Sequence, residues 1–96
     1  MSEPTFSVIV PVFNELENLP LLYDRVRQVM DQTGEGWELI LVDDGSSDGS
    51  TDLIRQLAAK DERVRPIIFA RNFGHQIAVT AGMDYSLGQA VTIIDA

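Results

Sequence analysis

Short apolar runs alternate along the chain with longer segments in which apolar residues recur every three or four positions. The short runs are rich in β-branched residues and are bounded by turn residues, a pattern that predicts buried strands. The four predicted strands are Phe6–Val12, Trp37–Val42, Val64–Ala70 and Ala90–Ile94. Because these runs are apolar at consecutive positions, we expect both faces of their sheet to be covered, as is typical of parallel sheets.

Apolar residues at helical spacing predict three amphipathic helices between the strands. Asn18 and Ser50 are the candidate N-caps of the first two helices, and Gly34 follows the first. The third helix is predicted over His75–Ser86. The residues expected to face the core are Leu19, Leu22, Val26, Val29 and Met30 in the first helix, Leu53, Ile54 and Leu57 in the second, and Ile77, Ala78, Ala81, Met83 and Tyr85 in the third.

The resulting order, βαβαβαβ, predicts an α/β fold with a parallel sheet and helices on both of its faces. Pro66 lies inside the third predicted strand, which indicates that this strand lies at an edge of the sheet or begins late. Right-handed crossovers place the carboxyl ends of all the parallel strands along one edge. Open α/β sheets bind ligands in the crevice at that edge, so the residues that follow each strand are the first candidates for a site.

Composition narrows the class of protein. The 96 residues suffice for one small domain, so residues 1–96 are treated as a single unit. A net charge of −8, from 15 acidic and 7 basic residues, argues against binding to nucleic acid. The chain has no cysteine, which excludes thiolate metal sites, and no run approaches the ~18 apolar residues of a membrane span. It ends directly after a predicted strand, and we expect it to be truncated.

Polar or charged residues follow every predicted strand. They are Asn14 and Glu15 after the first, Asp43 and Asp44 after the second, Arg71, Asn72 and His75 after the third, and Asp95 after the fourth. This convergence on one edge is a stronger signal than any single motif. Carboxylates from different strand ends can share a divalent cation, which can in turn hold a diphosphate.

Simpler interpretations apply to some of these residues. Ser47, Asp48 and Ser50 are best explained by turn and cap chemistry. A cap requires only one acid, so one member of the Asp43–Asp44 pair can contact a ligand while the other supports the loop. With no second histidine or cysteine, a histidine metal site lacks support. Neither the GxGxxG sequence nor a Walker-type phosphate loop is present.

Four short motifs occur in order: PVFNE at residues 11–15, VDDGSSD at 42–48, RNFG at 71–74 and IIDA at 93–96. Together they resemble the GT-A nucleotide-sugar glycosyltransferases, and most of all the polyprenyl-phosphate glycosyltransferases, the group that contains dolichol-phosphate mannose synthase. The resemblance implies a Rossmann-like GT-A fold, of which residues 1–96 are the N-terminal, nucleotide-sugar-binding part.

The resemblance also implies roles for single residues. Asp95 and Ala96 match the first two positions of the family's Asp-X-Asp motif, which binds Mg²⁺ or Mn²⁺ and the donor diphosphate. Asp95 is thereby the implied metal ligand and catalytic residue, and Arg71 is expected to face a phosphate of donor or acceptor. The residues implied to bind the nucleotide are Pro11, Phe13, Glu15, Val42, Asp44 and Ala96.

The implied reaction is metal-dependent transfer of a sugar from a nucleotide diphosphate sugar, with UDP favoured over GDP, to a polyprenyl phosphate. A single displacement would invert the anomeric centre. The resemblance further implies a membrane-associated protein, attached through segments outside residues 1–96, with its catalytic domain on the cytoplasmic side and with homo-oligomerisation left open. Residues 1–96 by themselves are expected to be inactive.

Three alternatives stay open at this point. The first is a GT-A enzyme that acts on a polysaccharide or a protein. The second is a receiver-like signalling domain that binds Mg²⁺ through the acid pair, although in receivers that pair follows the first strand and not the second. The third is a non-catalytic binding module, which would bind nucleotide and turn over nothing.

Overall fold

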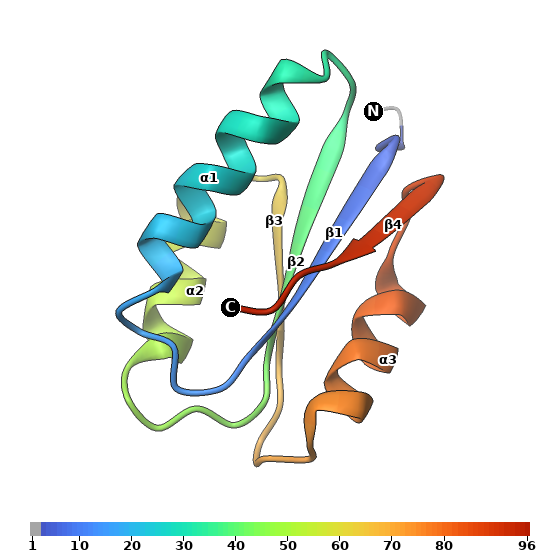
Figure 1. Cartoon of the computed structure of the whole chain (residues 1–96). Helices are drawn as coiled ribbons and strands as arrows, with labels where there is room; N and C mark the ends of the chain where they lie inside the picture. The colour runs from blue at the N-terminus through green and yellow to red at the C-terminus, as the bar shows by residue number, and fades with distance from the viewer. Residues whose placement is uncertain (1–2) are drawn as a thin grey trace.

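The computed structural model describes residues 3–96 and contains four strands and three helices that alternate along the chain (Figure 1). The strands are β1 (Phe6–Val12), β2 (Trp37–Asp43), β3 (Val64–Ile68) and β4 (Ala90–Ile93). The helices are α1 (Leu19–Gln32), α2 (Ser50–Lys60) and α3 (His75–Tyr85). Every predicted element is therefore present, and the ends of the strands lie close to their predicted positions.

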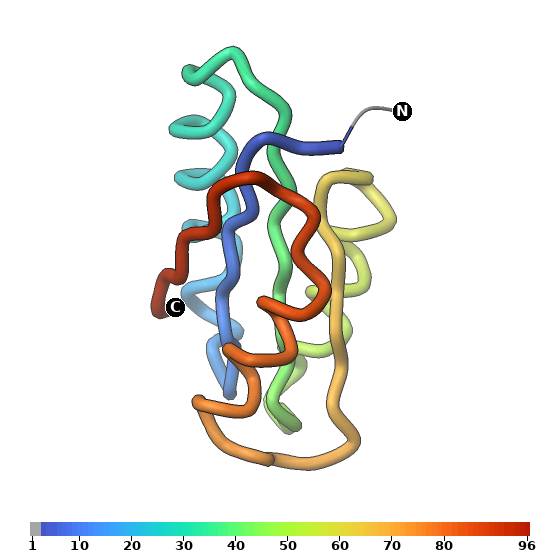
Figure 2. Tube along the Cα trace, turned by 90° about the vertical axis from the view of Figure 1, so that its right-hand side faces the viewer, coloured from blue at the N-terminus to red at the C-terminus, as the bar shows by residue number. Residues whose placement is uncertain are grey.

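The strands form one parallel sheet in the order β3-β2-β1-β4. Helices α1 and α2 cover one face of the sheet and α3 covers the other (Figure 1), and Figure 2 shows α3 from its own side, in front of the sheet. Strand β3, which contains Pro66, lies at an edge as predicted. The α/β fold with helices on both faces is thus confirmed, and all carboxyl ends of the strands point the same way.

Side chains of the two central strands alternate between two apolar layers, because successive residues of a strand point to opposite faces. The layer beneath α1 and α2 includes Val8, Val10, Val12, Leu39, Leu41, Leu19, Ile54 and Leu57, and the layer beneath α3 includes Ile9, Ile40, Val42 and Ala78. The same alternation continues past the last apolar residue of β2. It directs Asp43 toward α2 and Asp44 toward the loop that leads into α3.

One of the two predicted N-cap positions is confirmed and the other is not. Asn18 is the N-cap residue of α1 as predicted, but its side chain makes no cap hydrogen bond; its amide donates to Glu15 Oε2 at 2.7 Å. Ser50 is the first residue of α2, and the N-cap is Gly49, whose φ is 99°. The Ser50 hydroxyl instead donates to Asp48 Oδ1 at 2.5 Å and accepts from the Glu15 N–H at 3.1 Å. It therefore joins two loops.

The inward face of α1 is centred slightly differently from the prediction. Leu19 and Val26 are buried as expected, whereas Val29 is 61% exposed and Tyr23 is buried. At 3.6 residues per turn, Val29 lies about 80° around the helix from Leu19, at the margin of the buried stripe. The aromatic ring of Tyr23 lies nearer the centre of that stripe.

Helix α3 departs further from the prediction, because Ile77, Met83 and Tyr85 are all half-exposed or more. The helix lies so close to the sheet that a Cβ on Gly82 would be 2.5 Å from Ile9 Cγ2. At this separation only small residues fit between helix and sheet. Ala78 and Gly82 are therefore the buried residues of α3, and the larger apolar side chains point away.

At the amino-terminal edge of the sheet, Arg63 links α1 to the start of β3. Its Nε and Nη2 donate to the two oxygens of Asp61, each at 2.9 Å, and its Nη1 donates to Asp31 Oδ1 at 2.8 Å. Its guanidinium carbon lies 4.1 Å from the ring centroid of Trp37. The hydrogen bonds from Arg63, together with one from the Tyr23 hydroxyl, lower the pKa of Asp61 from 3.8 to about 2 although partial burial opposes this shift.

Candidate functional site

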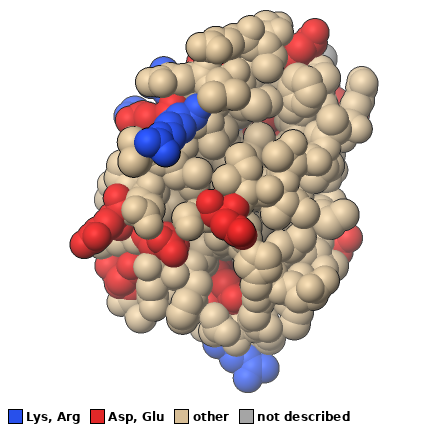
Figure 3. All heavy atoms as spheres, in the orientation of Figure 1, with Lys and Arg blue, Asp and Glu red and all other residues tan. Residues whose placement is uncertain are grey.

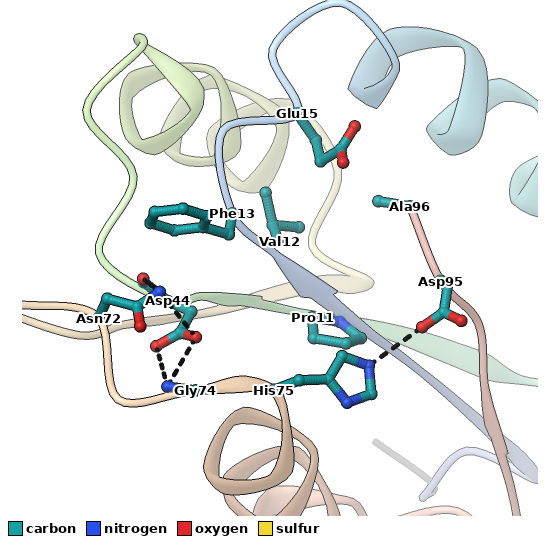
Figure 4. Close-up of a pocket in the computed structure, with 10 residues that line it drawn as sticks. All are labelled: Pro11, Val12, Phe13, Glu15, Asp44, Asn72, Gly74, His75, Asp95 and Ala96. Atoms are coloured by element: carbon teal, nitrogen blue, oxygen red, sulfur yellow. Dashed lines mark hydrogen bonds and ion pairs between the residues drawn. The ribbon is translucent and has the colours of Figure 1, made fainter.

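A pocket of about 390 Å³ opens at the carboxyl edge of the sheet (Figure 4). Each of the four loops that follow a strand contributes to its wall. The lining residues are Pro11, Val12, Phe13, Glu15, Asp44, Asn72, Gly74, His75, Asp95 and Ala96. The parallel topology therefore brings residues from both ends of the chain to one site.

The first loop of the pocket is held in a strained conformation by the second. Asn14 has a φ of 53°, in the left-handed region that residues other than glycine seldom adopt. Its Oδ1 accepts a hydrogen bond from the Ser47 N–H at 2.8 Å, and its own N–H donates to Ser46 Oγ at 2.9 Å. Such strain persists only where the surroundings enforce it. The VDDGSSD segment thus fixes the backbone that presents Phe13 and Glu15 to the pocket.

Asp43 is fully buried and supports this loop. Its Oδ1 accepts from the Ser46 N–H at 3.0 Å, and its Oδ2 accepts from the hydroxyl of Thr51 on α2. Asp48 likewise accepts hydrogen bonds from two backbone N–H groups. Both carboxylates are engaged in loop contacts, and neither lines the pocket.

Asp44 lies between the pocket and the loop that follows β3. Its Oδ1 accepts from the Phe73 N–H at 2.7 Å, and its Oδ2 accepts from the Gly74 N–H at 3.0 Å and from Asn72 Nδ2 at 3.2 Å. The residue is 3% exposed, yet it belongs to the pocket wall. A carboxylate group offers about four lone-pair directions, so Asp44 can hold this loop and still accept a hydrogen bond from a ligand.

Gly45 allows the two loops to touch. Its φ is +77°, and a Cβ at this position would lie 2.4 Å from both Arg71 C and Asn72 N. These are backbone atoms, which cannot swing aside as a flexible side chain could. The glycine of the VDDGSSD segment is therefore required for close packing as well as for the turn.

Asp95 follows β4 and faces the pocket opposite Asp44 (Figure 4). Its Oδ1 is 3.1 Å from Nε2 of His75, the first residue of α3, and both side chains are largely exposed. Within residues 3–96, no three His, Asp or Glu side chains are grouped so as to hold a metal ion by themselves. Mg²⁺ is nevertheless commonly held by one or two carboxylates together with substrate phosphates, and Mn²⁺ favours the same oxygen ligands. A single exposed carboxylate at the pocket mouth fits such a shared site.

The pocket is acidic. The carboxylates of Glu15, Asp44 and Asp95 line it, and no Lys or Arg of the described residues does. Figure 3 shows acidic side chains gathered over the lower half of this face, where the carboxyl ends of the strands lie. An anionic ligand would therefore need a cation or backbone N–H groups to offset the charge of the wall.

Two of the residues implied by the sequence do not reach the pocket wall. Val42 is fully buried, because its side chain points into the apolar layer that contains Ile9 and Ala78. Arg71 is placed outside the pocket, where its guanidinium carbon lies 4.7 Å from the ring centroid of Phe73. The implied residues that do line the pocket are Pro11, Phe13, Glu15, Asp44, Asp95 and Ala96.

Four lining residues had no assigned role in the sequence-based site: Val12, Asn72, Gly74 and His75. Three of them belong to the RNFGH segment that follows β3. Their place after a strand was the feature of the sequence that could have identified them as pocket residues. The contacts of Asn72 and Gly74 with Asp44 depend on the approach of two loops that are far apart in the chain.

A second cavity, of about 610 Å³, lies at the opposite edge of the sheet beside Trp37, Arg63, Arg65 and Leu87. Its two arginines are already paired, Arg63 with Asp61 and Asp31 and Arg65 with the buried Glu38. Every buried side-chain N and O atom of the described residues has a hydrogen-bond partner. We therefore place the candidate site at the carboxyl edge.

Residues 7–96 match the family described as glycosyl transferase family 2. Because the match covers nearly the whole chain, the chain belongs to this family of GT-A glycosyltransferases, as the sequence motifs predicted.

Several relatives share this segment. An uncharacterized glycosyltransferase of Bacillus subtilis (strain 168), YkcC, is 52% identical over 95% of this chain and 28% of that protein. The undecaprenyl-phosphate 4-deoxy-4-formamido-L-arabinose transferase of Pectobacterium carotovorum subsp. carotovorum (strain PC1) is 42% identical over 94% of this chain and 28% of that protein. A prophage bactoprenol glucosyl transferase homolog of Escherichia coli (strain K12) is 40% identical over 93% of this chain and 29% of that protein. The chain thus spans less than a third of the length of these relatives.

A solved structure has the same fold. The mannosyltransferase PcManGT from Pyrobaculum calidifontis, in complex with GDP-Man and Mn²⁺, superposes with a TM-score of 0.72 at 23% identity, over 99% of this chain and 28% of that one. This likeness supports the fold alone.

No helix within residues 3–96 has the length and apolar character needed to cross a membrane.

Proposed function

We propose that this chain is the donor-binding part of a glycosyltransferase that moves a sugar from a nucleotide diphosphate sugar to a polyprenyl phosphate. The observation that carries the proposal is the gathering of residues from all four strand-following loops around one pocket. Relatives named for undecaprenyl phosphate and bactoprenol support the acceptor class. The structural neighbour was solved with GDP-Man and Mn²⁺, and the donor proposed here is of the same chemical type.

The wall of the pocket suits the parts of such a donor. Phe13 is 47% exposed and offers an aromatic surface for the base, beside Pro11. Asp44 and Glu15 supply acceptors for base N–H groups and ribose hydroxyls. We favour UDP over GDP as the carrier. Val42 would support this site from beneath. Arg71, which lies over the ring of Phe73, keeps in-plane N–H donors that could contact a phosphate.

The diphosphate belongs at the Asp95 side of the pocket, with Ala96 beside it. Mg²⁺ or Mn²⁺, shared between Asp95 and the diphosphate, would stabilise the charge of the leaving group as a Lewis acid. The acceptor phosphate carries charge at neutral pH, with a second pKa of about 6, so the site requires no strong general base. Direct attack by its oxygen on the anomeric carbon breaks the bond to the diphosphate in one displacement and inverts the configuration.

Membrane attachment would come from segments outside residues 1–96, with the catalytic domain at the cytoplasmic surface, where the lipid phosphate would meet the donor. A suitable test incubates the full-length protein with undecaprenyl phosphate in vesicles and with labelled UDP- or GDP-sugars, in the presence of Mn²⁺. We expect label in the lipid fraction, and we expect Asp95→Asn to reduce it about 10²-fold or more. Asp84→Asn, which changes an exposed acid of α3 outside the pocket, is the matched control. Label in a polysaccharide or protein fraction with none in lipid would overturn the acceptor assignment.

A further inference from the structure

We propose that His75 is a positioning residue that orients the carboxylate of Asp95 toward the donor diphosphate and its cation. The inference rests on the proposed function, since it takes Asp95 as the residue that meets that diphosphate. It adds a role for a side chain to which the sequence analysis assigned none.

Asp95 is weakly held by its own strand. Pairing between β1 and β4 ends with Ile9 beside Ile93, and the last backbone hydrogen bond runs from the Ile94 N–H to Ile9 O at 2.9 Å. The Asp95 side chain is 83% exposed. Within the part of the chain that the structure describes, His75 is its only hydrogen-bond partner. Without that contact the carboxylate would be free to sample its staggered rotamers.

His75, in contrast, stands on a fixed element. It begins α3, which is packed against the sheet through Ala78 and Gly82. The preceding residue, Gly74, donates its N–H to Asp44 Oδ2 at 3.0 Å. The start of the helix is therefore tied both to the sheet and to the pocket wall, and it presents the imidazole to Asp95 from a constrained position.

The two oxygens of the Asp95 carboxylate have different surroundings, so one can be oriented by His75 while the other meets the ligand. His75 Nε2 lies 3.1 Å from Oδ1, and a hydrogen bond to this carboxylate oxygen requires an N–H on Nε2. No described residue hydrogen-bonds Oδ2. Carboxylates that bind metals are usually hydrogen-bonded in this way, and loss of the orienting partner typically weakens metal binding. A hydrogen bond between two exposed side chains contributes little to folding, so we expect the effect at the site and not in stability.

The test measures binding of UDP and of GDP to the full-length protein by calorimetry, with and without Mn²⁺. We expect His75→Ala to weaken the Mn²⁺-dependent affinity about tenfold and to leave both the affinity without metal and the unfolding midpoint unchanged. His75→Gln retains an N–H donor and should recover most of the loss. Gln76→Ala, which alters the next and exposed residue of α3, should bind as the wild type does.

A double-mutant comparison separates this role from direct contact with the nucleotide. In an Asp95→Asn background the metal-dependent gain should be absent, and His75→Ala should have no further effect. If His75→Ala weakens binding equally in that background, or equally without Mn²⁺, the imidazole contacts the nucleotide itself and the inference is overturned.

The same data distinguish failure of this inference from failure of the proposed function. If Asp95→Asn abolishes the Mn²⁺-dependent gain but His75→Ala binds as the wild type does, only the role of His75 is wrong. If the wild-type protein shows no Mn²⁺-dependent binding of either nucleotide, the assignment of Asp95 and the inference built on it both fall.

Discussion

The adjacent carboxylates of Asp43 and Asp44 point to opposite faces of the sheet: Asp43 accepts a hydrogen bond from Thr51 on α2, and Asp44 accepts one from the backbone before α3. Two carboxylates that lie close together repel each other. Here the alternation of a strand separates them and gives each carboxylate its own donors. Asp43 consequently stabilises the loop that follows β2, and Asp44 joins this loop to the one that follows β3 at the pocket wall.

This arrangement predicts that Asp44→Asn affects folding as well as binding. An amide at this position would present an N–H₂ group where the wild-type carboxylate accepts from Phe73 and Gly74. We expect the free energy of unfolding to fall by about 1–3 kcal/mol, as for other buried hydrogen-bond losses, and nucleotide affinity to fall as well. Urea denaturation and calorimetry measure the two effects. Asp84→Asn is the control, and unchanged stability of Asp44→Asn would contradict the described contacts.

The close approach of two loops at Gly45 gives a second prediction. Gly34 and Gly45 have similar positive φ values, +72° and +77°, but a Cβ at Gly34 would meet nothing within 4 Å. Gly34→Ala should therefore carry only the backbone cost, about 1–2 kcal/mol. Gly45→Ala should add an overpacking cost of about 1–3 kcal/mol, because its Cβ meets the backbone of Arg71 and Asn72. Equal denaturation midpoints for the two variants would show that the loops do not touch as described.

The pairing of Asp61 with Arg63 predicts a specific acid dependence of stability. The pKa of Asp61 is lowered from 3.8 to about 2 in the folded protein. The contribution of Asp61 to the free energy of unfolding is therefore fully present above its pKa in the unfolded chain. It is lost as the pH falls through its pKa in the folded protein. We expect the free energy of unfolding of Asp61→Asn to fall less steeply than that of the wild type between about pH 4 and pH 2.

Urea denaturation at a series of pH values measures this effect. Asp52→Asn, whose side chain is 81% exposed on α2, should leave the slope close to that of the wild type. A wild-type slope retained in Asp61→Asn would mean that another carboxylate is responsible for the acid dependence.

The strands themselves could be predicted because their apolar runs are uninterrupted, and Pro66 indicated an edge position for the third one. Parallel topology alone predicted that polar residues would converge on the carboxyl edge of the sheet. It did not predict the direction in which each side chain points there. Val42 matches a family motif, yet strand alternation turns it into the layer beneath α3. Arg71 lies over the ring of Phe73, and nothing in the sequence distinguishes this local contact from a contact with a ligand in the pocket.

The contacts of α3 were the least predictable feature. Helical spacing put Ile77 and Tyr85 in the core, but the approach of Gly82 to Ile9 reserves that space for small residues. The contact between His75 and Asp95 likewise depends on which strand lies beside β1. Strand order is a tertiary property, and a local pattern of residues carries little information about it.

The most direct test of the central claim is a crystal structure of the full-length protein with UDP and Mn²⁺. We expect the base to lie against Phe13 near Asp44, the diphosphate to lie near Asp95, and Mn²⁺ to contact an Asp95 oxygen. A nucleotide seated instead in the opposite cavity, between Trp37 and Leu87, with the carboxyl edge empty, would contradict the assignment of the site.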